Sequence, residues 1–317
     1  MKFLCICMSP AIDANVSLEK APRGEGEIFK NLKTVENAGG KTINVARWLA
    51  IRGAGAAAQD EACEVVCAGL LGEDNATLFE KEFSKYGIVD KMTRVNGATR
   101  RNEMITWPDG SFKLNQAAFE GVKFDEDEFL EELVSSIPRE SLGVQRIDES
   151  LGAHEFCAIL SGSLPKCCSV DFYAKAVKAF NAAGAFVVLD ASGEAMKRAL
   201  AAKPDLIKPN AEECEDLIGF IPKTPEEFQQ ATARLREFAT HVINSDGGAG
   251  AWFDGEFIAA PQVECIDTTS AGDTLLAEYC FSKDAKCAVA AGSAAVEMPG
   301  SNPPSVDRVK ELAAQIK

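Results

Sequence analysis

The strongest constraint on the fold of this chain is a repeated alternation of short apolar runs with longer stretches of helical periodicity. Each apolar run has the length of a buried strand, and the stretches between them place Ala, Leu, Val and Phe at helical spacing. Parallel strands need crossover connections, which helices provide, so this order predicts an α/β fold with a mostly parallel sheet covered by helices. The expected strands are 3–7, 64–68, 157–161, 185–190, 205–208 and 241–244, and the expected helices are 41–52, 75–86, 169–183, 194–201 and 225–239.

Two polar stretches interrupt this alternation. Both show the alternating pattern of exposed strands, and Trp107-Pro-Asp-Gly110 is a strong turn signal between two of these strands. The expected exposed strands are 15–18, 29–32, 103–107 and 111–114. We therefore expect a small β-sheet lid formed by 12–37 and 92–115, above a main α/β domain of residues 1–11, 38–91 and 116–317.

The net charge of the 317-residue chain is −15. Such a charge repels nucleic acid and anionic membranes, so neither is an expected partner, and an anionic ligand would need a local cationic pocket. No apolar run reaches the roughly 18 residues that a membrane-spanning helix needs. The apolar run at the N-terminus is also too short for a secretory signal. We expect a cytoplasmic protein.

The cysteines and histidines argue against two kinds of chemistry. Eleven cysteines are present without the paired spacing of a zinc site, and we expect reduced thiols that pack as small core residues. The two histidines, His154 and His241, are flanked by ordinary apolar or loop sequence. Histidine-driven hydrolysis is therefore disfavoured, and proton transfer in an enzyme of this sequence would fall to a carboxylate.

The run 267–274, Asp-Thr-Thr-Ser-Ala-Gly-Asp-Thr, precedes a helical pattern. Small residues before a helix leave its first N–H groups free and let an anion approach closely. Asp273 falls in the first helical turn, where it could be a catalytic base or only a favourable charge at a helix start. The run alone leaves both readings open.

A second glycine-containing run, 38–47, places Gly39 and Gly40 before another helix. The glycines permit close approach of the backbone, and Lys41 and Asn44 could address phosphates and hydroxyls; alternatively, the run is a turn into a core helix. It is not a P-loop, because that pattern requires glycine at position 35, which is valine here.

These runs, in this order, resemble the ribokinase-like (PfkB) family of sugar kinases. The runs 267–273, 39–46 and 9–13 resemble the family signatures Asp-Thr-Thr-Gly-Ala-Gly-Asp, Gly-Gly-Lys-Gly-x-Asn-Val-Ala and Asn-Pro-Ala-Ile-Asp. Each run differs from its signature at one position, namely Ser270, Thr42 and Ser9. The resemblance extends from Ser9 to Gly300. It implies a three-layer α/β/α fold with a β-sheet lid, and phosphoryl transfer from ATP assisted by Mg²⁺.

The resemblance also implies roles for individual residues. Asp273 would be the base, and Ser270, Ala271 and Gly272 would complete an anion hole for the transferred phosphoryl group. The residues implied to bind the sugar or its phosphate are Asp13, Lys30, Gly39, Gly40, Lys41, Asn44, Arg100 and Ser163. Those implied to bind the nucleotide are Lys208, Asn210, Ser245, Gly247, Gly250 and Ser293. Glu213 would order Mg²⁺ through water, although Asn210 and Glu213 are equally a sound capping box.

Lys41, Arg100 and the runs 161–165 and 190–195 resemble the branch that acts on phosphorylated ketohexoses, such as 1-phosphofructokinase and tagatose-6-phosphate kinase. Fructose 1-phosphate, converted to fructose 1,6-bisphosphate, is the first expectation. The alternatives are tagatose 6-phosphate, fructose 6-phosphate, or an unphosphorylated sugar or nucleoside. A non-catalytic sensor of sugar phosphate or nucleotide is a further alternative, favoured by three departures from the family pattern at Thr42, Ser270 and Glu278. An exposed lid could also pair two subunits into a homodimer.

Overall fold

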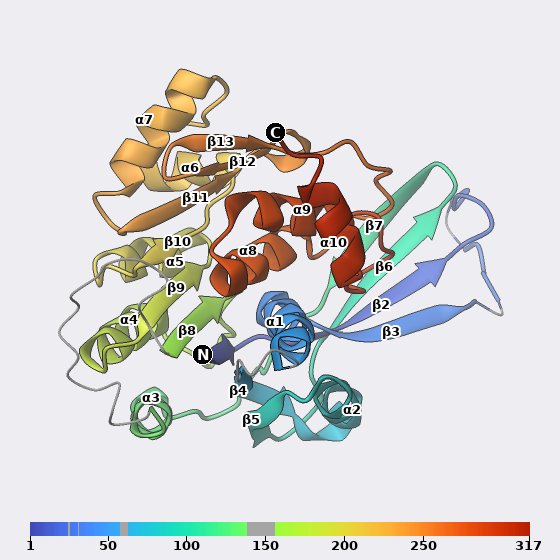
Figure 1. The fold of residues 1–317 in the computed structure, drawn as a ribbon. Helices are drawn as coiled ribbons and strands as arrows, with labels where there is room; N and C mark the ends of the chain where they lie inside the picture. Colours follow the sequence, from blue (N-terminus) through green and yellow to red (C-terminus); the bar gives the residue numbers. More distant parts are fainter. Residues whose placement is uncertain (25, 31, 58–62, 138–155) are drawn as a thin grey trace.

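The computed structural model describes residues 1–24, 26–30, 32–57, 63–137 and 156–317, which form two sheets (Figure 1). The strands of the large sheet are β1 (Lys2–Cys7), β4 (Glu64–Gly72), β5 (Val89–Val95), β8 (Phe156–Ser161), β9 (Phe186–Asp190), β10 (Leu206–Ile207), β11 (His241–Ser245), β12 (Gly250–Phe253) and β13 (Glu256–Ala259). Their order is β13-β12-β11-β10-β9-β8-β1-β4-β5. The pairs from β11 to β5 are parallel, and β12 and β13 add an antiparallel edge.

The large sheet is buried on both faces, as its parallel strands require. Alternate residues of β1 enter two separate cores: Phe3, Cys5 and Cys7 enter one, and Leu4 and Ile6 enter the other. The first core is closed by α1 (Lys41–Ala57), α2 (Thr77–Tyr86), α8 (Ala271–Ser282), α9 (Ala285–Ala295) and α10 (Val306–Ala313). The second is closed by α3 (Glu126–Ser135), α4 (Phe172–Ala182), α5 (Gly193–Leu200), α6 (Ala211–Ile218) and α7 (Pro225–Leu235). The result is helix, sheet and helix in three layers.

The small sheet projects from this body at the right of Figure 1. Its strands are β2 (Ala11–Ser17), β3 (Thr34–Gly39), β6 (Arg101–Trp107) and β7 (Gly110–Asn115), in the order β3-β2-β6-β7. The expected turn of 107–110 joins β6 to β7 as a hairpin. The small sheet is thus built from two segments of the chain that are well separated in sequence.

One predicted strand of the lid is wrong. The described residues of 29–32 have no regular structure, and the strand that pairs with β2 begins at Thr34. The preceding loop is held by its own contacts: Lys20 pairs with Glu27 at 2.6 Å and lies 5.9 Å from the centre of the Phe29 ring. Phe29 therefore packs within the loop, where its alternation with polar neighbours does not signal a strand.

The ranges expected for the lid also differ from the strands. Residues 92–95 lie in β5 of the large sheet, whereas Ala11, Ala38 and Gly39 lie in strands of the small sheet. Alternation alone cannot distinguish an edge strand of one sheet from a strand of another. The expected strands and helices of the main sheet are all present, with ends that differ by a few residues.

Within the described ranges, no helix is long and apolar enough to cross a bilayer. All eleven cysteines fall in those ranges and are free thiols, as expected. His241 is paired with Asp254 at 2.8 Å, and His154 lies outside the described residues.

Candidate active site

A cavity of about 980 Å³ lies between the lid, the first turns of α1 and α8, and the segments that follow β10 and β11. The carboxyl ends of parallel strands share one edge of a sheet, which brings these distant segments together. The predicted site residues that line it are Asp13, Gly40, Lys41, Asn44, Arg100, Lys208, Asn210, Glu213, Ser245, Gly247, Gly250, Ser270, Ala271, Gly272, Asp273 and Ser293. The groups predicted to bind sugar, phosphoryl group and nucleotide thus face one space.

Three predicted residues do not line the cavity. Lys30 and Ser163 are exposed elsewhere on the surface, and their contact with a substrate stays a prediction. Gly39 lies directly behind Asp13, since a Cβ at this position would be 2.0 Å from Asp13 Oδ2. Gly39 therefore allows the Asp13 carboxylate to occupy its place.

Helix α8 begins at the wall of the cavity with Ala271, Gly272 and Asp273. The first N–H groups of a helix have no carbonyl partner within it, so this end attracts anions. Gly272 leaves room for a close approach, because a Cβ there would lie only 3.3 Å from Lys208 Nζ. Together, the start of α8 and the Lys208 ammonium can hold an anion such as a phosphoryl group.

Asp190, at the end of β9, has no exposed surface and faces two lysines. Its carboxylate lies 3.4 Å from Lys41 Nζ and 3.3 Å from Lys208 Nζ, and it accepts a hydrogen bond from Ser161 Oγ at 3.2 Å. Burial alone would raise the pKa of Asp190, but the ammonium groups of Lys208 and Lys41 outweigh burial and lower it. Asp190 in turn raises the pKa of Lys41, against the opposing effect of burial. Asp190 and Lys41 are therefore both charged at neutral pH.

Asp273 is 7% exposed and accepts a hydrogen bond on Oδ2 from Asn44 Nδ2 at 2.9 Å. Burial and the negative charge of Asp190 raise the pKa of Asp273 to about 6, although Lys41, Asn44 and Lys208 oppose the increase. A carboxyl group with a pKa this close to neutrality can both take and release a proton. The geometry therefore fits the predicted base.

The lid contributes the opposite wall of the cavity. Asp13 Oδ1 accepts a hydrogen bond from Asn102 Nδ2 at 3.1 Å, on the neighbouring strand β6. Arg100 and Lys113 line the same wall, and none of the described carboxylates lies within ion-pair distance of either cation. The Nε of Arg100 is buried without a hydrogen-bond partner among these residues. Two cations, on which the Asp13 carboxylate acts from beyond ion-pair distance, therefore face the cavity of an acidic protein.

Sequence reasoning missed Asp190, Asn102 and Lys113 as site residues. Asp190 carried a signal, since it ends a buried apolar run where α/β sheets bind ligands. Asn102 lies two residues after Arg100, for which the family resemblance had implied a role. Lys113 carried none, because a lysine in an exposed strand is ordinary and only the pairing of β7 with β6 brings it to the cavity.

The comparisons with known proteins agree with this geometry. Residues 140–308 match the pfkB family carbohydrate kinases. The chain is 30% identical to 1-phosphofructokinase of Escherichia coli strain K12, over 98% of this chain and 95% of that one. The chain belongs to the pfkB family of carbohydrate kinases.

Solved structures show the same architecture. The pfkB-family chain matches phosphofructokinase-2 from Escherichia coli in complex with substrates and products, with a TM-score of 0.83, 23% identity and coverage of 100% and 99% of the two chains. It matches ribokinase from Thermotoga maritima with a TM-score of 0.68, 18% identity and coverage of 99% of each. The predictions of family, of a ribokinase-like α/β fold and of an ATP-dependent carbohydrate kinase are confirmed.

Two of the three departures from the pfkB pattern lie outside the cavity. Thr42 is fully buried, and its hydroxyl donates hydrogen bonds at 2.6 Å to the Ser161 carbonyl or at 3.1 Å to that of Ile6. Glu278 is also fully buried, and it accepts a hydrogen bond from Trp48 Nε1 at 2.8 Å and pairs with Arg52 at 2.9 Å. Both residues hold α1 in the kinase core and do not touch the cavity.

Asn210 and Glu213 form the capping box at the start of α6. Each side chain accepts a hydrogen bond from the backbone N–H of the other residue, at 2.7 and 3.0 Å. Because both residues also line the cavity, capping fixes their side chains at its edge. The capping hydrogen bonds are compatible with a contact of Asn210 to the nucleotide and of Glu213 to Mg²⁺ through water, and both contacts stay predictions.

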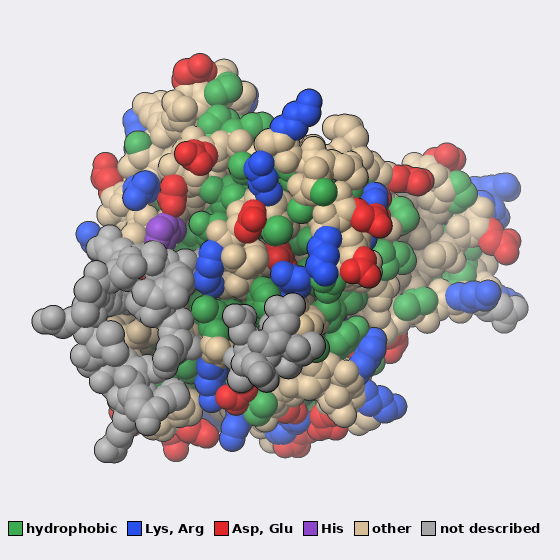
Figure 2. Space-filling view, in the orientation of Figure 1, with side chains coloured by type: hydrophobic (Ala, Val, Ile, Leu, Met, Phe, Trp, Pro, Cys, Tyr) green, Lys and Arg blue, Asp and Glu red, His purple; other side chains and the backbone are tan. Residues whose placement is uncertain are grey.

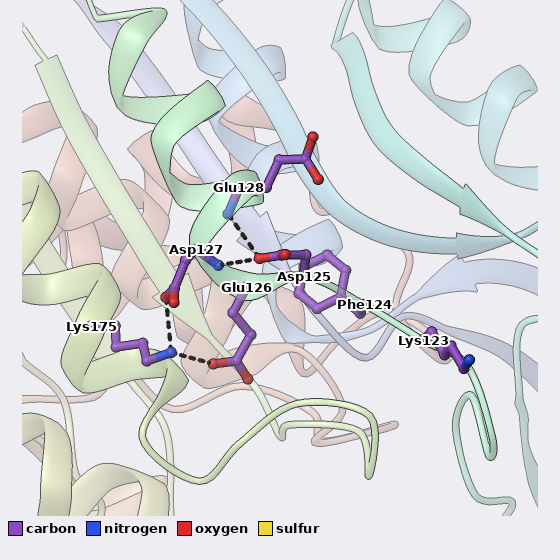
Figure 3. Close-up of a pocket in the computed structure, with 7 residues that line it drawn as sticks. All are labelled: Lys123, Phe124, Asp125, Glu126, Asp127, Glu128 and Lys175. Carbon is purple, nitrogen blue, oxygen red and sulfur yellow. Dashed lines mark hydrogen bonds and ion pairs between the residues drawn. The ribbon is translucent and has the colours of Figure 1, made fainter.

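A smaller pocket of about 670 Å³ lies at the start of α3 (Figure 3). Several of its polar groups bond within this region: Asp125 caps α3 by accepting from the N–H groups of Asp127 and Glu128 at 3.1 Å. Glu126 accepts from Ser169 and pairs with Lys175 at 3.1 Å. These contacts fasten α3 to the segment around α4, and we assign the pocket no ligand.

Asp190→Asn tests the charge arrangement on which the site rests. We expect it to lower the free energy of unfolding by about 3 kcal/mol at pH 7, because it leaves two ammonium groups without a buried counter-charge. Urea unfolding measures this loss. A carboxylate whose pKa is lower in the folded than in the unfolded state stabilises the folded state only above its pKa in the unfolded state. The loss of stability in Asp190→Asn should therefore shrink as the pH falls below about 4. Asp254→Asn, at a half-buried pair with His241, is the control and should cost less; equal losses would contradict this account.

Proposed function

We propose that this kinase transfers the γ-phosphoryl group of ATP to a hydroxyl of a phosphorylated ketohexose. Fructose 1-phosphate is the first candidate, with fructose 1,6-bisphosphate and ADP as products. The observation that carries this proposal is the pair of cations on the lid wall, Arg100 and Lys113, which form no ion pair with a described carboxylate and share the longer-range charge of Asp13. A phosphate on the sugar supplies an anion for these cations, and the planar guanidinium of Arg100 suits its oxygens. The relatives named 1-phosphofructokinase support a ketohexose phosphate.

In this proposal the sugar lies against the lid and the nucleotide against the loop after β11. Asp13, held by Asn102, accepts hydrogen bonds from sugar hydroxyls. The reacting hydroxyl lies at Asp273, which takes its proton as the oxygen attacks the γ-phosphorus and ADP leaves. The N–H groups at the start of α8 and the ammonium of Lys208 stabilise the charge on the moving phosphoryl group. The lid sheet excludes water, which would otherwise compete as the acceptor.

Mg²⁺ fits this site as a partner of ATP phosphates and water rather than as a metal held by a protein cage. Among the described residues there is no group of three or more His, Cys, Asp or Glu side chains that could bind an ion directly. Glu213 would hold Mg²⁺ through water, consistent with the preference of this ion for retaining water ligands. When bound, Mg²⁺ neutralises charge on the ATP phosphates.

A coupled ATP-consumption assay tests the substrate. We compare fructose 1-phosphate with tagatose 6-phosphate, fructose 6-phosphate, fructose and ribose, and expect the highest kcat/KM for fructose 1-phosphate. Preference for an unphosphorylated sugar would leave Arg100 and Lys113 without a role and would overturn the proposal. Nucleotide binding without turnover of any sugar in a wider panel would instead favour a sensor.

The proposed base predicts a pH profile. Because burial raises the pKa of Asp273 to about 6, the kcat/KM for the sugar phosphate should fall tenfold per pH unit below that value, as the base becomes protonated. Asp273→Asn should lower kcat by about 10²–10⁴-fold while ATP still binds in a calorimetric titration. Asp254→Asn, outside the cavity, is the matched control and should keep the wild-type profile.

The proposed contact of Arg100 with the sugar phosphate predicts that its loss affects phosphorylated and unphosphorylated substrates differently. Loss of a charged hydrogen bond costs about 1.5–3 kcal/mol, so Arg100→Ala should raise the KM for fructose 1-phosphate by about 10–100-fold. The kcat/KM for unphosphorylated fructose should not change. Arg101→Ala is the control, because Arg101 pairs with Glu36 at 2.7 Å and does not line the cavity. An equal effect of Arg100→Ala on both sugars would contradict a phosphate contact.

We also propose that the lid sheets of two subunits pair. Phe112 and Leu114 alternate with Lys113 along β7, so they point away from the cavity, and they are 41% and 49% exposed. The Phe112 ring lies 5.8 Å from that of Trp107 on the paired strand, and Figure 2 shows hydrophobic side chains at the surface of the projecting lid. An apolar face on an otherwise charged sheet suits a second copy of the chain.

The homodimer is tested by light scattering after gel filtration. Phe112→Glu should convert a dimer to a monomer, because it places a charge in the apolar face. Phe257→Glu is the matched control: Phe257 is also 41% exposed, but it lies on β13 of the large sheet. A monomeric wild-type protein, or a Phe112→Glu variant that remains dimeric, would exclude pairing through this face.

A further inference from the structure

Arg47 lies on α1, three residues after Asn44, and is 2% exposed. Its guanidinium donates to four groups from different parts of the fold: the Ala38 carbonyl in β3, the Ser301 carbonyl after α9, the Glu82 carboxylate in α2 and Asn44 Oδ1 at 3.2 Å. All three nitrogens of the guanidinium are therefore engaged. A buried cation that donates through all three of its nitrogens is fixed in one orientation.

This orientation determines which way the Asn44 amide points. A guanidinium has donors only, so the amide atom facing Arg47 must be the oxygen Oδ1. The amide nitrogen Nδ2 must then face the other way, toward Asp273 Oδ2, at 2.9 Å. The Asp273 carboxylate thus receives a donor and not an acceptor, and its second oxygen, Oδ1, is left for a substrate hydroxyl.

We propose that Arg47 is a positioning residue for phosphoryl transfer: it locks the Asn44 amide so that this amide donates to Asp273. The inference rests on the proposed role of Asp273 as the base. Without Arg47, the amide can rotate by half a turn and place its oxygen against the carboxylate. That contact is repulsive for the ionised form of Asp273 and favours the protonated form, which cannot act as a base.

Arg47 also connects this lock to the lid. The Ala38 carbonyl that it holds belongs to β3, and only Gly39 and Gly40 separate Ala38 from the start of α1. The Arg47 side chain thus bonds both to the end of lid strand β3 that precedes α1 and to the Asn44 amide beside Asp273. A change in the position of β3 would therefore reach Asp273 through two side chains, those of Arg47 and Asn44.

The other groups that face Asp273 are Asp190 from β9, Lys41 from α1 and Lys208 from the segment after β10. Arg47 bonds to none of them, so its replacement leaves this arrangement in place. Its effect on Asp273 should then pass through Asn44 alone. A double-mutant cycle can establish whether it does.

The experiment titrates Asp273 directly in the unliganded full chain by NMR of ¹³C-labelled aspartate carboxyls, with Asp273→Asn to assign the signal. Arg47→Met and Asn44→Ala should each raise the pKa of Asp273 by about one unit. The double variant should show no further increase beyond Asn44→Ala. At pH 6 the kcat/KM of Arg47→Met should be about fivefold below wild type, with recovery at higher pH. Glu82→Gln keeps the contact between Arg47 and Asn44 and is the matched control, with no expected shift.

An unchanged pKa in Arg47→Met would overturn the inference, as would a further increase in the double variant, which would indicate a direct effect of the Arg47 charge. Arg47→Lys retains the charge, and it replaces Arg47→Met in the cycle if that variant does not fold. If Arg47→Lys shifts the pKa of Asp273 and Asn44→Ala abolishes that shift, the effect again passes through the Asn44 amide. The titration needs no substrate, so a wild-type protein inactive on every sugar phosphate would refute the proposed function and leave this test intact.

Discussion

Asp190 has no exposed surface, and it can remain ionised only because Lys41 and Lys208 lie within 3.4 Å of its carboxylate. An isolated buried carboxylate would be protonated. Two lysines around one carboxylate leave an excess of positive charge beside the cavity, which Lys41 and Lys208 both line. That charge attracts phosphate oxygens locally, although the whole chain carries a charge of −15.

The same three charges set the behaviour of Asp273. Burial and Asp190 favour its protonated form, whereas the two lysines and the Asn44 amide favour its ionised form, and the balance brings the pKa to about 6. The balance depends on topology: parallel strands deliver Asp190 and Lys208 to one edge of the sheet, and the first turns of α1 and α8 deliver Lys41 and Asp273 to that edge. A fold with these strands in another order would separate the charges and return Asp273 toward an ordinary acid.

The sequence predicted those parts of the site that are formed by adjacent residues. A glycine-rich helix start can be recognised from adjacent residues, and Gly39, Gly40 and the run 270–273 were found in this way. Contacts that depend on how strands pair in a sheet cannot be recognised from adjacent residues. Lys113 reaches the cavity because it pairs with Met104 in β6, whereas Lys30 belongs to a loop whose course depends on a pair between Lys20 and Glu27. Of the nine strands that the described residues contribute to the large sheet, six were expected from their apolar runs, whereas β5, β12 and β13 at its two ends were not. The prediction of a strand failed at 29–32, where the Phe29 ring packs on a loop lysine.

The departures from the family pattern have different physical meanings because of where they lie. Thr42 and Glu278 have side chains that bond within the core around α1. Ser270 alone lies in the cavity, with a left-handed backbone at φ 66°, a conformation that costs about 1 kcal/mol for a residue with a Cβ. The N–H and hydroxyl of Thr274 both donate to the Ser270 carbonyl and hold this turn. Helix α8 begins directly after this left-handed residue, so the strain lies at the step that places the start of the helix on the wall of the cavity.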